Sequence, residues 1–232
     1  MTEPVCLVTG VGPGTGSALV ERFAAGYRVA MLARSHERLA ALAQRLPAAH
    51  AYPCDVSDPV ALAEVIAQVR AEMGDPEVAI HNAVGGAFGD FLSVEPEVLQ
   101  RNFEVNVMAL LHLGRALAPA MIASGRGAIV CTGNTAAFRG KAEFAGFAPT
   151  KAAQRILAES MARKLGPLGV HVGYLAIDAV IDLPWTRKRY RDAADDFFCK
   201  PSDIAETCWA LAHQPRSAWT FEQVIRPFAE RW

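Results

Sequence analysis

The sequence predicts an α/β fold: a doubly wound parallel sheet of about seven strands with helices on both faces. Short apolar or β-branched runs alternate with longer amphipathic segments, which is typical of βαβ units. The 232 residues suit one such domain, and a content of 52% hydrophobic and 20% charged residues supports a large buried core. No linker, composition shift or internal repeat divides the chain, so we expect a single domain over 1–232.

Each predicted strand is a short apolar run, and each predicted helix is a longer run with an apolar face. The strands are expected at 4–10, 27–33, 49–56, 77–83, 127–133, 169–177 and 222–228. The helices are expected at 15–25, 36–46, 58–73, 96–124, 147–166 and 201–213. The connection 178–200 has no clear strand. Its aromatic residues suit a lid over a site and an irregular packing segment equally well.

Charge and cysteine usage exclude several classes of protein. A formal net charge of −1 argues against a nucleic-acid partner, which requires an excess of basic residues. The five cysteines have no metal-ligand spacing, which predicts buried free thiols in a reducing compartment and no metal site. No charged leader precedes the first strand, and no apolar run reaches the roughly 18 residues of a membrane span. These features predict a cytoplasmic protein.

A glycine-rich turn follows the first strand. The segment TGVGPGTGSALVERFA places Gly10, Gly14 and Gly16 between strand and helix, where backbone N–H groups can approach a pyrophosphate. Glycines alone are weak evidence because turns use them anyway, but their position before the first helix raises their value. The pattern resembles the fingerprint of the short-chain dehydrogenase/reductase family. The resemblance implies a Rossmann fold, a nicotinamide dinucleotide cofactor and a small-molecule substrate.

Three further strand ends support this resemblance. In LARSHERL, Ala33 replaces the acid expected for NAD, and Arg34 offers the cation that a 2′-phosphate requires, which favours NADP over NAD. The alternative for Arg34 is the start of a solvent-facing helix. In CDVSD, the resemblance implies that Asp55 binds the adenine amino group, the alternative being a helix cap. In HNAVGG, it implies that Asn82 and the backbone of Ala83 bracket the adenosine ribose.

The family's reaction needs a proton at the oxygen that accepts hydride. The resemblance implies four residues: an Asn that kinks a long helix and holds a water, a Ser that positions the oxygen, a Tyr as acid/base, and a Lys four residues later. Asn106, in FEVNVMALLHLG, and Lys151, in TKAA, match two of them. Lys151 would also hold the nicotinamide ribose. Its alternative is an ordinary exposed helix lysine.

The other two positions differ from the family pattern. Phe147 stands four residues before Lys151, at the position of the Tyr, and Asn134 stands at that of the Ser. Phenylalanine has no proton to donate, and an asparagine amide polarises a carbonyl without transferring a proton. Several replacements for the acid/base are open. They are Lys151 acting directly, a water held by Asn106, Tyr190, and Asp178 or Asp182, although these two acids also suit solvated or capping roles.

We therefore expect an NADP(H)-dependent oxidoreductase that acts on an unidentified carbonyl or alcohol and has an altered proton-donor site. The competing interpretation is a weakly active or inactive NADP-binding protein with a regulatory or structural role. Retention of Lys151 and Asn106 favours the first, and loss of the Ser and the Tyr favours the second. The resemblance also implies a homodimer or homotetramer formed through helices 96–124 and 147–166.

Overall fold

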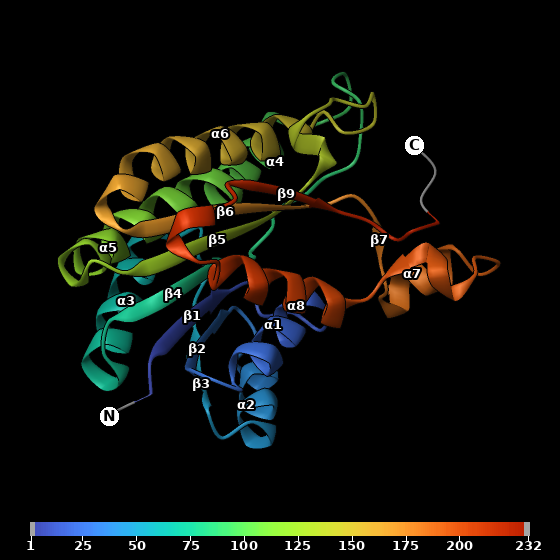
Figure 1. The fold of residues 1–232 in the computed structure, drawn as a ribbon. Coiled ribbons are helices and arrows are strands. Elements are labelled where there is room, and N and C mark those ends of the chain that lie inside the picture. Colours follow the sequence, from blue (N-terminus) through green and yellow to red (C-terminus); the bar gives the residue numbers. More distant parts are fainter. Residues whose placement is uncertain (1–2, 230–232) are drawn as a thin grey trace.

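The strands form a seven-stranded parallel sheet. The computed structural model describes residues 3–229, so residues 1–2 and 230–232 of the predicted domain lie outside the described part. The strand order is β3-β2-β1-β4-β5-β6-β9 (Figure 1). The strands are β1 (Val5–Thr9), β2 (Arg28–Ala33), β3 (Ala49–Pro53), β4 (Pro76–His81), β5 (Gly127–Asn134), β6 (Val170–Ile177) and β9 (Glu222–Ile225). The predicted fold class is confirmed, and every predicted strand is present.

Helices cover both faces of this sheet (Figure 1). They are α1 (Thr15–Phe23), α2 (His36–Arg45), α3 (Pro59–Met73), α4 (Pro96–Phe103), α5 (Ala109–Ser124), α6 (Ala148–Leu165), α7 (Pro184–Arg189) and α8 (Pro201–Ala212). Side chains of α3, α5 and α6 form one core layer, and those of α1, α2 and α8 form the other. Within β1, Leu7 belongs to the first layer and Cys6 to the second, so this strand is buried on both faces.

The predicted helix 96–124 is interrupted. A π-helical turn, Glu104–Met108, joins α4 to α5, and the N–H of Ala109 bonds to the carbonyl of Glu104, five residues back. Such turns are frequent at functional sites. Within the run Pro96–Ser124, an 18-residue stretch has a mean hydropathy of 1.5, long and apolar enough to cross a membrane, which the sequence prediction overlooked. In the fold, however, its apolar face packs against the sheet through buried residues such as Leu110 and Leu117, so it is a core helix.

The expectation that 178–200 has no strand is wrong. β7 (Val180–Ile181) and β8 (Phe198–Cys199) pair in parallel as a separate two-stranded ladder, with α7 between them. Each strand has only two residues, too few for a periodic pattern to reveal it. In Figure 1, α7 lies beyond the main sheet, on the side to which β7 leads.

The order of the strands predicts where a ligand-binding site lies. The chain runs outward from β1 to β3 and then returns to start again at β4, beside β1, so the direction of winding reverses between β1 and β4. In open α/β sheets, ligands bind outside the carboxyl ends of the strands at such a reversal.

Candidate active site

A cavity of about 1010 Å³ lies at this position. Its wall combines the glycine-rich loop, the residues after β2, β3 and β4, the end of β5, the start of α6, and part of the segment 178–200. Most of the sequence-predicted site residues line it: Gly10, Gly14, Gly16, Arg34, Asp55, Asn82, Ala83, Asn134 and Lys151. Asn106 and Phe147 are not among its lining residues.

The glycines of the loop have two different functions. Gly10 has a φ of +71°, and a Cβ there would lie 2.5 Å from Ala83 Cα, so the close approach of the loop to the end of β4 requires glycine. A Cβ on Gly16 would lie 2.4 Å from the carbonyl oxygen of Gly10, which explains how α1 starts so near the strand. Gly12, by contrast, has open space where a Cβ would stand. The loop therefore presents bare backbone and the positive end of α1 to the cavity.

Two arginines lie at the end of β2. Arg34 and Arg38 are both exposed and both line the cavity. Ser35 caps α2 by accepting a hydrogen bond from the N–H of Arg38, at 3.3 Å, so Arg38 is in the first turn of that helix. The sequence analysis named Arg34 alone. Arg38 follows the N-cap Ser35 in the first turn of the helix that opens directly after Arg34, and this position is the signal that would have added it.

Asp55 is held as an ionised acid beside these arginines. Its Oδ1 accepts hydrogen bonds from the Ser57 N–H (3.1 Å) and the Ser57 hydroxyl (2.7 Å). Burial opposes ionisation, but these hydrogen bonds and the charge of Arg34 outweigh it and lower the pKa of Asp55. The cap of α3 is Asp58, which accepts from the N–H groups of Val60 and Ala61. Asp55 is thus not a helix cap.

Asn82 ties three strand ends together. Its Nδ2 donates to the carbonyl of Gly10 (2.9 Å), and its Oδ1 accepts from the hydroxyl of Thr132 (3.0 Å), which lies on β5. The neighbouring N–H of Ala83 bonds to Thr9 Oγ1 at 3.3 Å. The side chain of Asn82 therefore fixes the loop against the central strands.

Lys151 is a buried lysine, 2% exposed, so the alternative of an ordinary surface lysine is wrong. Its Nζ donates to the carbonyl of Thr132 (3.1 Å) and to Gln154 Oε1. Within residues 3–229 no carboxylate forms an ion pair with it. Burial disfavours the charged form and lowers the pKa of Lys151 to about 8.

Asn106 sits in the π-helical turn and is completely buried. Its Oδ1 accepts from the Gly85 N–H (3.0 Å), and its Nδ2 donates to the Gly85 carbonyl (2.7 Å) and to Thr150 Oγ1 (2.8 Å). Its backbone carbonyl accepts from Gln154 Nε2 at 2.8 Å. Protein groups thus occupy its amide and its carbonyl, which argues against the hypothesis of a water held there.

Asn134 and Phe147 stand at the two positions where we expected a departure from the family pattern. Asn134 ends β5, and its Oδ1 accepts from the Ala136 N–H at 3.1 Å, which leaves its NH₂ group as a donor. Phe147 immediately precedes α6, beside Gly86 and with its ring centroid 6.5 Å from that of Phe144. This apolar contact contains no proton donor.

The alternative acids after β6 are already paired. Asp178 accepts from the hydroxyl of Thr135 at 2.8 Å and lies 3.6 Å from Arg139 and 3.4 Å from Arg226. Tyr190, the other candidate, packs against Phe197 and is not in the cavity wall.

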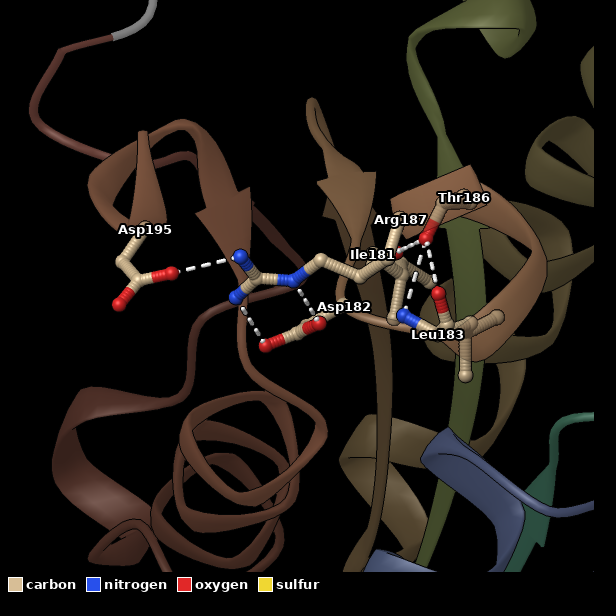
Figure 2. A network of polar contacts seen from close by, with 6 residues as sticks. All are labelled: Ile181, Asp182, Leu183, Thr186, Arg187 and Asp195. Carbon is tan, nitrogen blue, oxygen red and sulfur yellow. Dashed lines mark hydrogen bonds and ion pairs between the residues drawn. The ribbon is translucent and has the colours of Figure 1, made fainter. Parts of the chain in front are cut away.

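Asp182 belongs to a network that braces α7 (Figure 2). Arg187 binds both of its carboxylate oxygens, at 2.7 and 2.8 Å, and reaches Asp195 at 2.6 Å. The hydrogen bonds and charge of Arg187 lower the pKa of Asp182. Asp178 and Asp182 are therefore ion-paired rather than solvated or capping, and neither is a free proton donor.

The same network positions the residues of 178–200 that reach the cavity. Thr186 accepts from the N–H of Leu183 at 2.9 Å and donates to the carbonyl of Ile181 at 2.6 Å (Figure 2). Leu183, Pro184 and Trp185 line the cavity. A Cβ on Gly14 would lie 2.4 Å from Leu183 Cδ2, so this leucine rests on the glycine-rich loop.

Comparison with known proteins agrees with this geometry. A family model described as short chain dehydrogenase matches residues 4–187. The chain is 33% identical to the epidermal retinol dehydrogenase 2 of Mus musculus over 163 residues, covering 68% of this chain and about half (53%) of that relative. It is 34% identical to the D-erythrulose reductase of Gallus gallus over 168 residues, covering 72% and 67%. A solved metagenomic short-chain oxidoreductase in complex with NADP is similar over 98% of both chains, with 29% identity and a TM-score of 0.85. The chain therefore belongs to the short chain dehydrogenase family.

Proposed function

We propose that this protein is an NADP(H)-dependent oxidoreductase that interconverts a carbonyl and an alcohol, with Lys151 as its proton donor. One observation carries the proposal: the buried ammonium of Lys151, unpaired with any acid in the described chain, lines the same cavity as the glycine-rich loop. A lysine whose pKa lies near 8 is suited to general acid/base catalysis near neutral pH.

The cavity fits a dinucleotide with a 2′-phosphate. The open space beside Gly12 and the start of α1 suit a pyrophosphate, and the exposed guanidinium groups of Arg34 and Arg38 suit a second phosphate. Asp55 beside them suits the adenine amino group. The complex of a similar structure with NADP supports the preference for NADP over NAD.

The residues at the other end would serve the reacting oxygen. Bound NADPH would supply a hydride to the carbonyl carbon. The free NH₂ of Asn134 would donate a hydrogen bond to the oxygen on which negative charge develops. Lys151 would transfer a proton to that oxygen and become a neutral amine, which then takes a proton from solvent through the cavity. Phe147, which does not line the cavity, would contribute no proton.

A weakly active or inactive NADP-binding protein is the second candidate function. Phe147 favours it, because the residue at this position cannot transfer a proton. The hydrogen bonds that occupy Asn106 favour it as well. In this case the cavity would bind the dinucleotide for regulation or assembly.

The assembly and location of the protein are part of the same proposal. Ile122 on α5 and Ile156 on α6 are exposed apolar side chains, which supports a homodimer or homotetramer formed through these helices. All five cysteines are buried free thiols, which supports a reducing compartment such as the cytoplasm. We also propose that 178–200 is a lid, because Leu183 and Trp185 reach the cavity from it.

The test is NADPH oxidation with a panel of aldehydes, ketones and quinones. The natural protein, Phe147→Tyr and Lys151→Met are compared, with Lys164→Met as an exposed control on the same helix. We expect turnover by the natural protein and the control and a large loss in Lys151→Met. Turnover by Phe147→Tyr alone would refute the proposal and support the second candidate function.

A further inference from the structure

Gln154 connects the two buried residues of the reaction end. It lies on α6, one turn after Lys151, and is completely buried. Its Oε1 accepts from Lys151 Nζ, and its Nε2 donates to the backbone carbonyl of Asn106 at 2.8 Å. The opposite orientation of the amide would set N–H against N–H and oxygen against oxygen. The two partners therefore fix which end of the amide faces the lysine.

This contact determines where the ammonium of Lys151 can point. An ammonium has three N–H groups. One is bound by the carbonyl of Thr132 and one by Gln154, and both acceptors are neutral and held by secondary structure. Because Lys151 also lines the cavity, the third N–H is left for a group inside it.

The amide also determines where a proton can go. A glutamine side chain accepts through its oxygen and donates through its nitrogen, but it does not titrate, so it does not pass a proton onward. The other titratable groups that face Lys151 are His81 on β4 and Cys131 on β5. Burial, followed by the charge of Lys151, lowers the pKa of His81 to about 3, and burial raises the pKa of Cys131 to about 12. Both stay neutral near neutral pH.

We propose that Gln154 is a positioning residue whose neutral amide fixes the Lys151 ammonium with one N–H facing the cavity and closes the path of that proton into the interior. The inference rests on the proposed function of Lys151. It assigns a role to a residue that no motif in the sequence singled out. The neutrality of the amide matters, because a carboxylate at position 154 would stabilise the charged form of Lys151 and raise its pKa. The lysine would then release its proton to the substrate less readily.

Direct titration of Lys151 tests this without any substrate. The chain has five lysines, so carbon NMR of protein labelled at the lysine ε-carbon gives few signals, and Lys151→Met identifies the one of interest. The natural protein is compared with Gln154→Glu and Gln154→Met, which keep the side-chain length. Gln44→Glu, at an exposed site on α2, controls for the added charge. Melting curves confirm that each variant is folded.

We expect Gln154→Glu to increase the proton affinity of Lys151 at least about tenfold and Gln154→Met to decrease it, with Gln44→Glu unchanged. If one of the two variants at position 154 does not fold, the Lys151 titration of the other tests the inference. A Lys151 titration within about twofold of the natural protein in every folded variant at position 154 would overturn the inference. The result is separable from the proposed function: the expected titrations with no carbonyl turnover would leave the positioning intact and remove the reaction. Turnover with unchanged titrations would support the reaction and overturn the positioning role of Gln154.

Discussion

The two ends of the cavity handle charge in opposite ways. At the adenosine end, Arg34 and Arg38 are exposed and their guanidinium groups are accessible to solvent and ligand. At the reaction end, the single ammonium of Lys151 is buried among neutral partners, Thr132 and Gln154. Recognition of a phosphate requires an accessible cation. A proton donor that works near neutral pH requires a lysine whose pKa has been lowered, and burial does this.

Binding and chemistry should therefore be separable by substitution. Changes among the exposed arginines should alter cofactor affinity and leave the chemical step intact. Changes around Lys151 should alter the chemical step and its pH dependence. Three measurements test the properties of the two ends, and a fourth tests the network around Arg187.

The largest effect is expected at the reaction end. Lys151→Met should reduce kcat for carbonyl reduction by about 10²–10⁴-fold, the usual contribution of a positioned acid. Steady-state rates at saturating NADPH measure it, with Lys164→Met as the matched exposed control. A loss below about tenfold would show that another group delivers the proton.

A smaller effect is expected at the adenosine end. Arg34→Ala combined with Arg38→Ala should raise the Kd for NADPH by about 10–100-fold, because the two solvent-exposed arginines together contribute about 1.4–2.8 kcal/mol, at the lower end for charged hydrogen bonds. The Kd for NADH, which has no 2′-phosphate, should change little, and kcat at saturation should stay within about twofold. Fluorescence titration with both cofactors measures this, with Arg45→Ala as control. An equal loss of NADH affinity would disprove recognition of the 2′-phosphate.

The pH profile tests the reaction end alone. As the proposed donor, Lys151 would release a proton only from its charged form, and burial lowers its pKa to about 8. The kcat/KM for carbonyl reduction should therefore be level below pH 8 and fall about tenfold per pH unit above it. Measurement of kcat/KM from pH 6 to 10 checks whether it falls as the pH rises. A rate that stays level to pH 10 would contradict a proton transfer from Lys151.

The smallest effect is expected at the brace of α7. Asp182→Asn weakens the pairing with Arg187, but the pair is partly exposed, so the free energy of unfolding should fall by only about 0.5 kcal/mol. Urea unfolding measures it, with the exposed Asp196→Asn as control. An equal loss in both variants would show that the network does not stabilise the fold.

The fold could be predicted from the sequence because its signals are local. Each main strand is a short apolar run between turns, and Gly10 and Gly16 mark a turn where no larger residue fits. The partners of the reaction end are not local. Gln154 reaches Asn106 across 48 residues, through the packing of α6 against a π-helical turn. Nothing in the neighbourhood of either residue indicates that contact, and β7 and β8 are too short to produce a pattern.

The contact of Leu183 with Gly14 has a consequence for kinetics. On the proposed function, a dinucleotide whose pyrophosphate is bound over Gly14 would have to displace Leu183, and the network around Arg187 holds the segment that carries this leucine. The observed affinity is then reduced by the fraction of molecules in which the loop is uncovered. Cofactor association should accordingly level off at high cofactor concentration, at the rate at which this segment moves.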